Sequence, residues 1–143
     1  KSMDGVYIGS IEKGTAEENA QQKRSAASAD FLGEHMGDAP VLVIPCSAAG
    51  MRTEGQPGMF AASMLGNVLP GMWSFMLAAR ARGLGTAWTT LHLMQEQAVA
   101  DILGIPFDTV QQVALSPLAY TKGTDFKAAA RPAPDSIIHW DTW

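Results

Sequence analysis

The feature that most constrains the fold is the segment 70–82, PGMWSFMLAARAR, which is apolar on almost every side of a helix. Pro70 suits the first turn of a helix, so we expect a helix over residues 70–82. A surface helix shows one apolar stripe, whereas a helix that is apolar all round is buried in a core or in an interface. A chain of 143 residues has little room to bury such a helix by itself. The pattern therefore predicts a partner subunit packed on this helix.

A turn and a strand are expected directly after the helix. Arg80 and Arg82 lie at its predicted C-terminus, where cations complement the helix dipole. Gly83 is expected to take the left-handed conformation that ends many helices. Residues 86–90, TAWTT, combine β-branched and aromatic side chains and predict a strand. The pattern explains Gly83 but leaves the nearby Gly85 without a structural role.

The first half of the chain predicts a helix, a strand and a loop. We expect a surface helix within residues 15–37, with two glutamates at its start and Gly33 or Gly37 at its end. The continuous apolar run at 41–44 predicts a buried strand. Residues 47–58 are rich in glycine and proline, and a loop of this length is expected to be functional or mobile.

The second half continues the alternation, which is typical of an α/β or α+β fold in a single domain over residues 1–143. Residues 93–106 predict a short amphipathic helix that is capped by Gly104, and residues 110–120 predict a strand that is broken by Pro117. The apolar face of the short helix is expected to consist of Met94, Ala98, Ile102 and Leu103. A short apolar segment follows at 136–140, and Trp140 and Trp143 are expected to anchor this tail.

Composition excludes several classes of function. The net charge is −4 and the isoelectric point is about 5.2, which argues against a nucleic-acid or anionic-membrane surface because both require basic patches. The chain has no run of about 18 uninterrupted apolar residues, so no membrane span is expected. One cysteine suits a reducing cytoplasm. The chain begins at Lys1 without a signal-like stretch, and we expect it to be an N-terminally truncated part of a longer protein.

Single residues do not predict a catalytic or metal site. The three histidines lack the spacing of metal ligands, and each is expected to lie at the surface or to be hydrogen-bonded. Cys46 is expected to be a buried, unreactive thiol. The Gly-Leu-Gly at 83–85 follows a helix, so it does not match a dinucleotide-binding turn, which links a strand to a helix.

Five motifs in order resemble the C-terminal half of the FMN-dependent nitroreductase family. They are the helix and corner NVLPGMWSFMLAARARGLGT, the following strand AWTTL, LGIP, VALSPLAY and the tail RPAPDSIIHWDTW. Residues 39–46 also fit the strand that precedes this block in the family. The resemblance is strongest over residues 67–143. It implies a mixed sheet flanked by helices, a homodimer built on the 70–82 helix, and flavin bound at the dimer interface.

The resemblance also implies positions that bind the cofactor. The segment after Gly-Leu-Gly runs beside the flavin ring in this family, so Thr89, Thr90 or the Leu91 N–H is expected to donate near flavin N5. Pro70 is among the implied cofactor-binding positions, and Gly85 is expected to allow a close approach to the flavin. Arg131 is the implied ligand of the FMN phosphate, which a guanidinium binds with two parallel charge-assisted bonds. The alternative for the two threonines is that they serve strand propensity alone.

The sequence departs from the family pattern in ways that leave three functions open. Trp73 and Ser74 stand where the family has Gln-Asn, Ala119 stands in place of glycine, and residues 1–38 show none of the family's N-terminal Arg/Ser phosphate motif. The first expectation is an FMN oxidoreductase that uses NAD(P)H and reduces a small acceptor such as a nitroaromatic or a quinone. The second is a protein of the same fold that holds or sequesters flavin without turnover, and the third is a structural fragment without cofactor.

Overall fold

The computed structural model describes residues 15–128, 131 and 133–143. The predicted domain over 1–143 also includes residues 1–14, 129–130 and 132, which lie outside the described residues. In chain order the elements are α2 (Ala16–His35), η1 (Met36–Asp38), β1 (Val41–Val43), β2 (Cys46–Ser47), α3 (Gly58–Arg80), β3 (Leu84–Thr86), η2 (Leu91–Gln95), α4 (Glu96–Leu103), β4 (Gln111–Gln112), β5 (Ser116–Tyr120) and η3 (Pro134–Ser136). Helices around small antiparallel sheets make this an α+β fold, as predicted.

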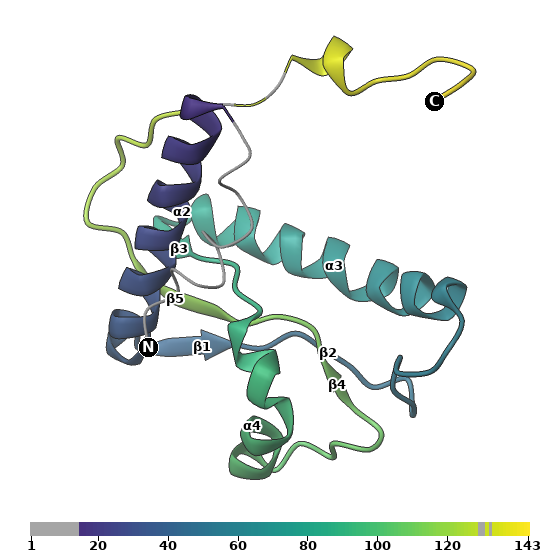
Figure 1. Ribbon diagram of the computed structural model, residues 1–143. Helices are drawn as coiled ribbons and strands as arrows, with labels where there is room; N and C mark the ends of the chain where they lie inside the picture. The colour runs from purple at the N-terminus through teal and green to yellow at the C-terminus, as the bar shows by residue number, and fades with distance from the viewer. Residues whose placement is uncertain (1–14, 129–130, 132) are drawn as a thin grey trace.

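Two small sheets organise the described chain. The first has the strand order β1-β5-β3, so its central strand is the last of the three in the sequence. Both of its strand pairs are antiparallel. The second pairs β2 with β4. Helix α3 packs against β3 and β2, while α2 and α4 lie on other sides of the sheets (Figure 1).

The buried core is small. Its largest members are Met64 and Met72 of α3 and the run 113–115 between β4 and β5. Ser116 is fully buried because its hydroxyl is satisfied: it accepts from the Ala87 N–H at 3.1 Å and donates to the Pro117 carbonyl at 3.0 Å. Because the core is small, much apolar side-chain surface stays exposed in the single chain.

A capping box begins α2. The Thr15 hydroxyl accepts from the Glu18 N–H at 3.3 Å, and the Glu18 carboxylate accepts from the Thr15 N–H at 2.6 Å. These two bonds satisfy N–H groups that have no partner in the first turn. The helix ends at His35 and continues as η1, so the prediction that Gly33 or Gly37 caps it was wrong.

Helix α3 starts twelve residues earlier than predicted. It begins at Gly58 and ends at Arg80, so Pro70 lies inside the helix and not in its first turn. Proline lacks the N–H that an interior helical position donates, so a carbonyl of the preceding turn loses its usual donor. This part of the helix is exposed, and the Pro70 carbonyl still accepts from the Ser74 hydroxyl at 2.9 Å. Apolar side chains of this helix remain uncovered in the single chain: Trp73 is 60% exposed and Leu77 is 53% exposed.

The longer helix also changes the membrane argument. Within the described residues, α3 is the one helix that is long and apolar enough to cross a membrane, with a mean hydropathy of 1.2, and 11% of its most apolar window is buried. A core helix of a soluble protein passes the same test, so one such helix is weak support for a span. The sequence-based expectation rested on a helix of only 13 residues, from 70 to 82.

The corner after α3 agrees with the predicted role of Gly83. This residue has a φ of 76° and follows the last turn of the helix. Strand β3 then covers Leu84–Thr86 and begins two residues before the predicted strand at 86–90. Beyond β3, Thr89 forms an isolated bridge with Leu115. The strand prediction therefore had the right type of structure in a shifted position.

Helix α4 agrees with its predicted cap. Gly104 has a φ of 68°, and the following Ile105 N–H donates to the Ala100 carbonyl at 2.9 Å. The predicted apolar face is exposed in the single chain, with Met94 at 71% and Ile102 at 82%. The helix packs through Ala100, which is fully buried, on the opposite side.

Strand pairing corrects two further expectations. The predicted strand at 110–120 is interrupted at 113–115 and not at Pro117, which lies within β5 opposite Leu42. Strand β1 was expected to be buried, yet Val41 and Leu42 are nearly half exposed. It is an edge strand of the described sheet.

The C-terminal segment is exposed in the described structure. Residue 131 and residues 133–143 are all exposed, and the segment extends away from the rest of the molecule (Figure 1). Trp140 is 82% exposed and Trp143 is 101% exposed, so the prediction that they anchor the tail within the chain was wrong. The Trp143 ring stacks on His139 instead, with 4.6 Å between centroids.

Candidate functional site

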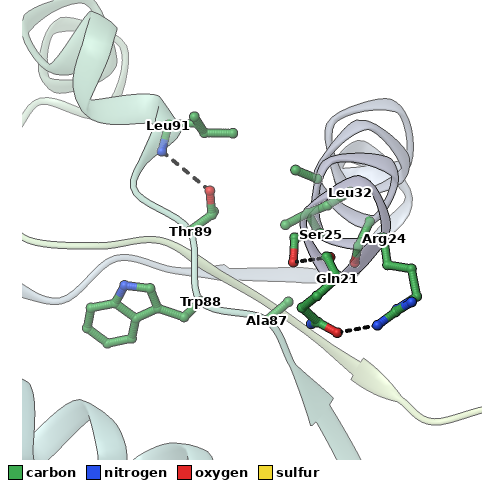
Figure 2. A pocket seen from close by; sticks show the side chains of 10 residues that line it. Gln21, Arg24, Ser25, Leu32, Ala87, Trp88, Thr89 and Leu91 are labelled. Atoms are coloured by element: carbon green, nitrogen blue, oxygen red, sulfur yellow. Dashed lines mark hydrogen bonds between the residues drawn. The ribbon is translucent and has the colours of Figure 1, made fainter. Parts of the chain in front are cut away.

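A cavity of about 400 Å³ lies between α2 and the extended segment 87–91. Figure 2 shows the helix on one side and the extended segment on the other, with the Trp88 ring turned away from α2. The lining residues are Gln21, Arg24, Ser25, Ser28, Ala29, Leu32, Ala87, Trp88, Thr89 and Leu91. Two segments more than 50 residues apart in sequence therefore form this site.

Helix α2 supplies most of the polar lining. Its lining positions recur at the three- and four-residue spacing that places side chains on one helix face. The Arg24 guanidinium donates to the Gln21 side-chain oxygen at 2.6 Å, and the Ser25 hydroxyl donates to the Gln21 carbonyl at 3.2 Å. Arg24 is the one charged residue in the lining. The helical wall of the cavity therefore combines a cation with hydroxyl groups.

Thr89 in the opposite wall is fixed by three hydrogen bonds within the chain. Its N–H donates to the Leu115 carbonyl at 2.9 Å, and its carbonyl accepts from the Leu115 N–H at 2.8 Å. Its hydroxyl accepts from the Leu91 N–H at 3.3 Å. Thr89 is 7% exposed, whereas Trp88 is 41% exposed and Thr90 is exposed, so Thr89 is the buried, hydrogen-bonded point of this wall.

The structure brings together two of the six predicted cofactor-binding residues. Thr89 and Leu91 line the cavity, whereas Thr90 lies between them with its side chain exposed and outside the lining. Pro70, in the middle of α3, does not line it, and neither does Arg131, which is exposed in the C-terminal segment.

Gly85 does not line the cavity either, and it has a packing reason within the chain. It lies in the middle of β3, opposite Ala119 of β5. A Cβ added at Gly85 would come to 3.0 Å from the Thr121 methyl carbon. A larger side chain at this position would therefore push against the neighbouring segment, whatever its effect on a cofactor.

A second polar cluster lies beyond η2, and sequence reasoning missed it. The Arg52 and Glu96 side chains form an ion pair at 2.5 Å and are only 15% and 12% exposed. Arg52 also donates to the Phe107 carbonyl at 3.1 Å, and its guanidinium lies 3.9 Å from the centroid of the Phe107 ring. Glu96 in turn accepts from the Gln112 N–H at 2.9 Å. The hydrogen bonds to Glu96 and to the exposed Glu54 raise the pKa of Arg52, which stays charged.

His92 and Cys46 lie in the electrostatic field of Glu96. Cys46 is half-buried and not buried as expected. Burial still raises the pKa of its thiol, and the Glu96 charge raises it further, in the direction expected for an unreactive thiol. His92 contradicts its expectation, because both ring nitrogens are buried without a hydrogen-bond partner in the described structure. His35 and His139 behave as expected: His35 contacts Asp38 at 3.1 Å, and His139 is exposed. The described residues contain no group of three or more side chains that could hold a metal ion.

Comparison with known protein families gives a match over most of the chain. A family model described as "Nitroreductase family" matches residues 6–120. This chain belongs to the nitroreductase family. Membership supports a flavin-dependent oxidoreductase, because nitroreductases generally bind FMN and use nicotinamide donors. No curated protein matches the sequence.

The matched region of this nitroreductase chain covers both walls of the cavity. It includes α2 and the segment 87–91, and it reaches further toward the N-terminus than the motifs that carried the sequence resemblance. It ends at Tyr120, so Arg131 and the C-terminal tail lie outside it. The family match therefore includes the residues of both cavity walls, but it does not include Arg131, the predicted ligand of the phosphate.

The buried His92 predicts a pH-dependent stability. Burial lowers the pKa of His92 below its ordinary value of 6.5, and the nearby Glu96 opposes this only in part. The unfolded chain therefore binds a proton more readily than the folded chain as the pH falls through about 6.5, and the folded state loses stability in that range. We expect the free energy of unfolding, measured in urea, to fall from pH 7.5 to pH 5.5 less steeply in His92→Gln than in the parent protein. His139→Gln, at an exposed site, should keep the parental slope; equal slopes for all three proteins would contradict the assignment.

Proposed function

We propose that this chain is an FMN-dependent oxidoreductase that transfers electrons from NAD(P)H to a small acceptor such as a nitroaromatic or a quinone. The observation that supports this most is that the family match includes both walls of a cavity at which the predicted flavin-contacting residues Thr89 and Leu91 lie. The flavin would supply the hydride and electron chemistry, while the protein binds and orients the reacting groups.

The lining residues fit part of a flavin mononucleotide. A volume of about 400 Å³ lies within the range of ligand pockets in proteins, roughly 300–1,000 Å³. Leu32, Ala87 and Leu91 offer apolar surface for a ring, and Arg24 offers a charge that suits an anionic group. The Thr89 hydroxyl accepts a hydrogen bond but donates to no protein acceptor among the described residues. Its hydrogen is therefore available for a ligand atom.

The geometry favours Thr89 over Thr90 as the side-chain donor. Thr90 points to solvent outside the cavity, and the Leu91 N–H already donates to Thr89. In this arrangement the Thr89 hydroxyl can receive one hydrogen bond from Leu91 and give another to the ligand. A donor held at a fixed place orients the ring and favours the oxidation state that accepts the bond.

Replacing Thr89 with valine is therefore expected to weaken FMN binding by about 0.5–1.5 kcal/mol, the net worth of one hydrogen bond. It should also shift the flavin midpoint potential, measured by spectroelectrochemical titration. Thr89→Ser keeps the hydroxyl and should stay close to the parent protein. Thr90→Val is the matched control and should change neither value. A larger effect at Thr90 than at Thr89 would contradict this assignment.

We also propose a homodimer packed on α3. Its exposed apolar residues Leu69, Trp73 and Leu77 form a surface that the single chain leaves uncovered. A bilayer around α3 is the weaker alternative, because α3 packs against β3, an edge strand of the described sheet. Lipid-exposed sheet edges do not occur in the hydrocarbon region, since their backbone groups would lack partners. The exposed tail offers further apolar side chains, including Trp140, to a second copy.

Two measurements on the purified protein test the proposed function. Flavin absorbance that co-purifies with the chain, or FMN that binds on addition, is expected; no binding of either FMN or riboflavin would overturn the proposal. Anaerobic addition of NADH or NADPH should then bleach the flavin, and a nitroaromatic or quinone should restore its colour. Bound flavin that neither donor reduces would instead favour the alternative, a flavin-binding or sequestering protein without turnover.

A further inference from the structure

The segment 89–96, which we call the 89–96 arc, is held at both ends by one buried stretch of chain. At the first end, Thr89 and Leu115 exchange two backbone hydrogen bonds at 2.9 and 2.8 Å. At the second end, the Gln112 N–H donates to the Glu96 carboxylate, and the Gln112 side-chain amide donates to the Glu96 carbonyl, both at 2.9 Å. Gln112 is 1% exposed and Leu115 is 5% exposed. The stretch 112–115 is thus a rigid base for the arc.

Between its two ends the arc is a single short helix. Leu91 begins η2, and Glu96 follows its last residue and starts α4. The Leu93 N–H donates to the Thr90 carbonyl at 3.0 Å, and the Glu96 N–H donates to the Leu93 carbonyl. These two bonds link Glu96 to Leu93 and Leu93 to Thr90, which lies next to Leu91. The Leu91 N–H in turn donates to the Thr89 hydroxyl at the cavity.

A third element, the loop before α3, completes the anchor at Glu96. Arg52 contacts both carboxylate oxygens of Glu96, at 3.3 and 2.5 Å, and is itself held by the Phe107 carbonyl and ring. The adjacent Thr53 is bound to the Gln111 side chain, with its N–H donating at 2.9 Å. The loop is therefore fastened to β4 as well as to α4.

We propose that Arg52 is a positioning residue: through Glu96 it holds the 89–96 arc so that the Thr89 hydroxyl and the Leu91 N–H keep their arrangement at the cavity. Arg52 does not line the cavity, so its effect on a ligand there is transmitted and not direct. The role toward flavin rests on the proposed function, whereas the effect on the arc can be measured without any ligand.

The test compares Arg52→Met with Glu54→Gln. The first removes all contacts of the guanidinium, including those to the buried Glu96, whereas the second removes only the charge of the exposed partner, because Glu54 is 64% exposed and Glu96 is 12% exposed. Amide hydrogen exchange of the full chain should show faster exchange at Leu91 and Leu93 in Arg52→Met, by roughly tenfold, because local opening controls exchange at such sites. Exchange at Leu115 should change less, and Glu54→Gln should leave all three amides unchanged. Unchanged exchange at Leu91 in Arg52→Met would overturn the proposal.

A flavin readout separates positioning from general stability. In protein loaded with FMN, Arg52→Met should shift the flavin midpoint potential, and Arg52→Lys should restore part of the shift by keeping one charged contact. Glu96→Gln, which keeps the shape of the side chain, serves as the second variant if Arg52→Met does not fold, and it should shift the potential in the same direction. A parental potential in folded, flavin-loaded variants would overturn the role toward flavin. Failure of the parent protein to bind FMN would overturn the proposed function instead, while the exchange experiment would still decide whether Arg52 holds the arc.

Discussion

Replacing Leu77 with glutamate is expected to convert the protein into monomers that keep their fold. Leu77 lies on α3 and is 53% exposed in the single chain, so a carboxylate there is solvated in the monomer. In a dimer packed on α3 the same carboxylate would be buried without a partner, which costs several kcal/mol or more. Light scattering of the parent and variant proteins measures the change in mass, and circular dichroism shows whether the fold is kept.

Ile102→Glu is the matched control for this change. Ile102 is 82% exposed on α4, away from the proposed interface, and the same substitution there should leave the mass unchanged. Phe75 is a poorer site for the test because it is half-buried against its own chain. A parent protein that is monomeric with flavin bound would contradict the proposed dimer directly.

Replacing Glu96 with alanine is expected to destabilise the folded chain by about 3–5 kcal/mol, the usual effect of removing one partner of a buried ion pair. Arg52 would keep its charge in a site where it is 15% exposed, and the Gln112 N–H would lose its acceptor. Urea unfolding followed by circular dichroism measures the loss. At this chain length the melting temperature should fall by roughly 6–20 °C.

Glu54→Ala is the control, because Glu54 bonds the same arginine from the surface. Exposed ion pairs contribute little, and the expected loss is below about 1 kcal/mol. Equal losses in the two variants would mean that the Arg52–Glu96 pair is no more important than its exposed neighbour. The comparison therefore measures the buried contact with the same cation in both cases.

Local signals predicted the parts of the fold that depend on local chemistry. Gly83 and Gly104 were both predicted to end helices, and both have positive φ angles. These predictions succeeded because the left-handed conformation depends on the residue itself. Pro70 misled for a related reason: proline favours a first turn, but an exposed interior position also tolerates it when the surrounding segment is strongly helical.

Burial was predicted less well, because it depends on what covers a surface. The apolar run at β1 was expected to be buried, yet Leu42 is exposed in the single chain, and so is Ile102 on the apolar face of α4. The apolar pattern of a sequence indicates which face of an element favours burial, but it does not indicate which other element or subunit packs against that face. The same holds for Trp140 and Trp143, whose apolar side chains favour packing but are 82% and 101% exposed in the described structure.

The candidate site was predicted only where a family motif covered it. Thr89 and Leu91, which were predicted through the Gly-Leu-Gly motif, line the cavity, whereas its α2 wall was not predicted because polar residues on a surface helix carry no periodic signal. The Arg52–Glu96–Gln112 cluster was also missed. Arg52 and Glu96 are 44 residues apart in sequence, and nothing in a single sequence links a loop arginine to a distant helix start.

The order of strands in the larger sheet has a consequence for synthesis of the chain. The central strand β5 is the last to be made, and Val41 of β1 finds its partner only at Leu118. At ribosomal rates this separation corresponds to roughly 4–15 s, during which the apolar β1 has left the ribosome without a strand to pair with. The sheet cannot begin to close until that delay is over. Release of the nascent chain before residue 118 would leave an unpaired apolar strand, which is a template for aggregation.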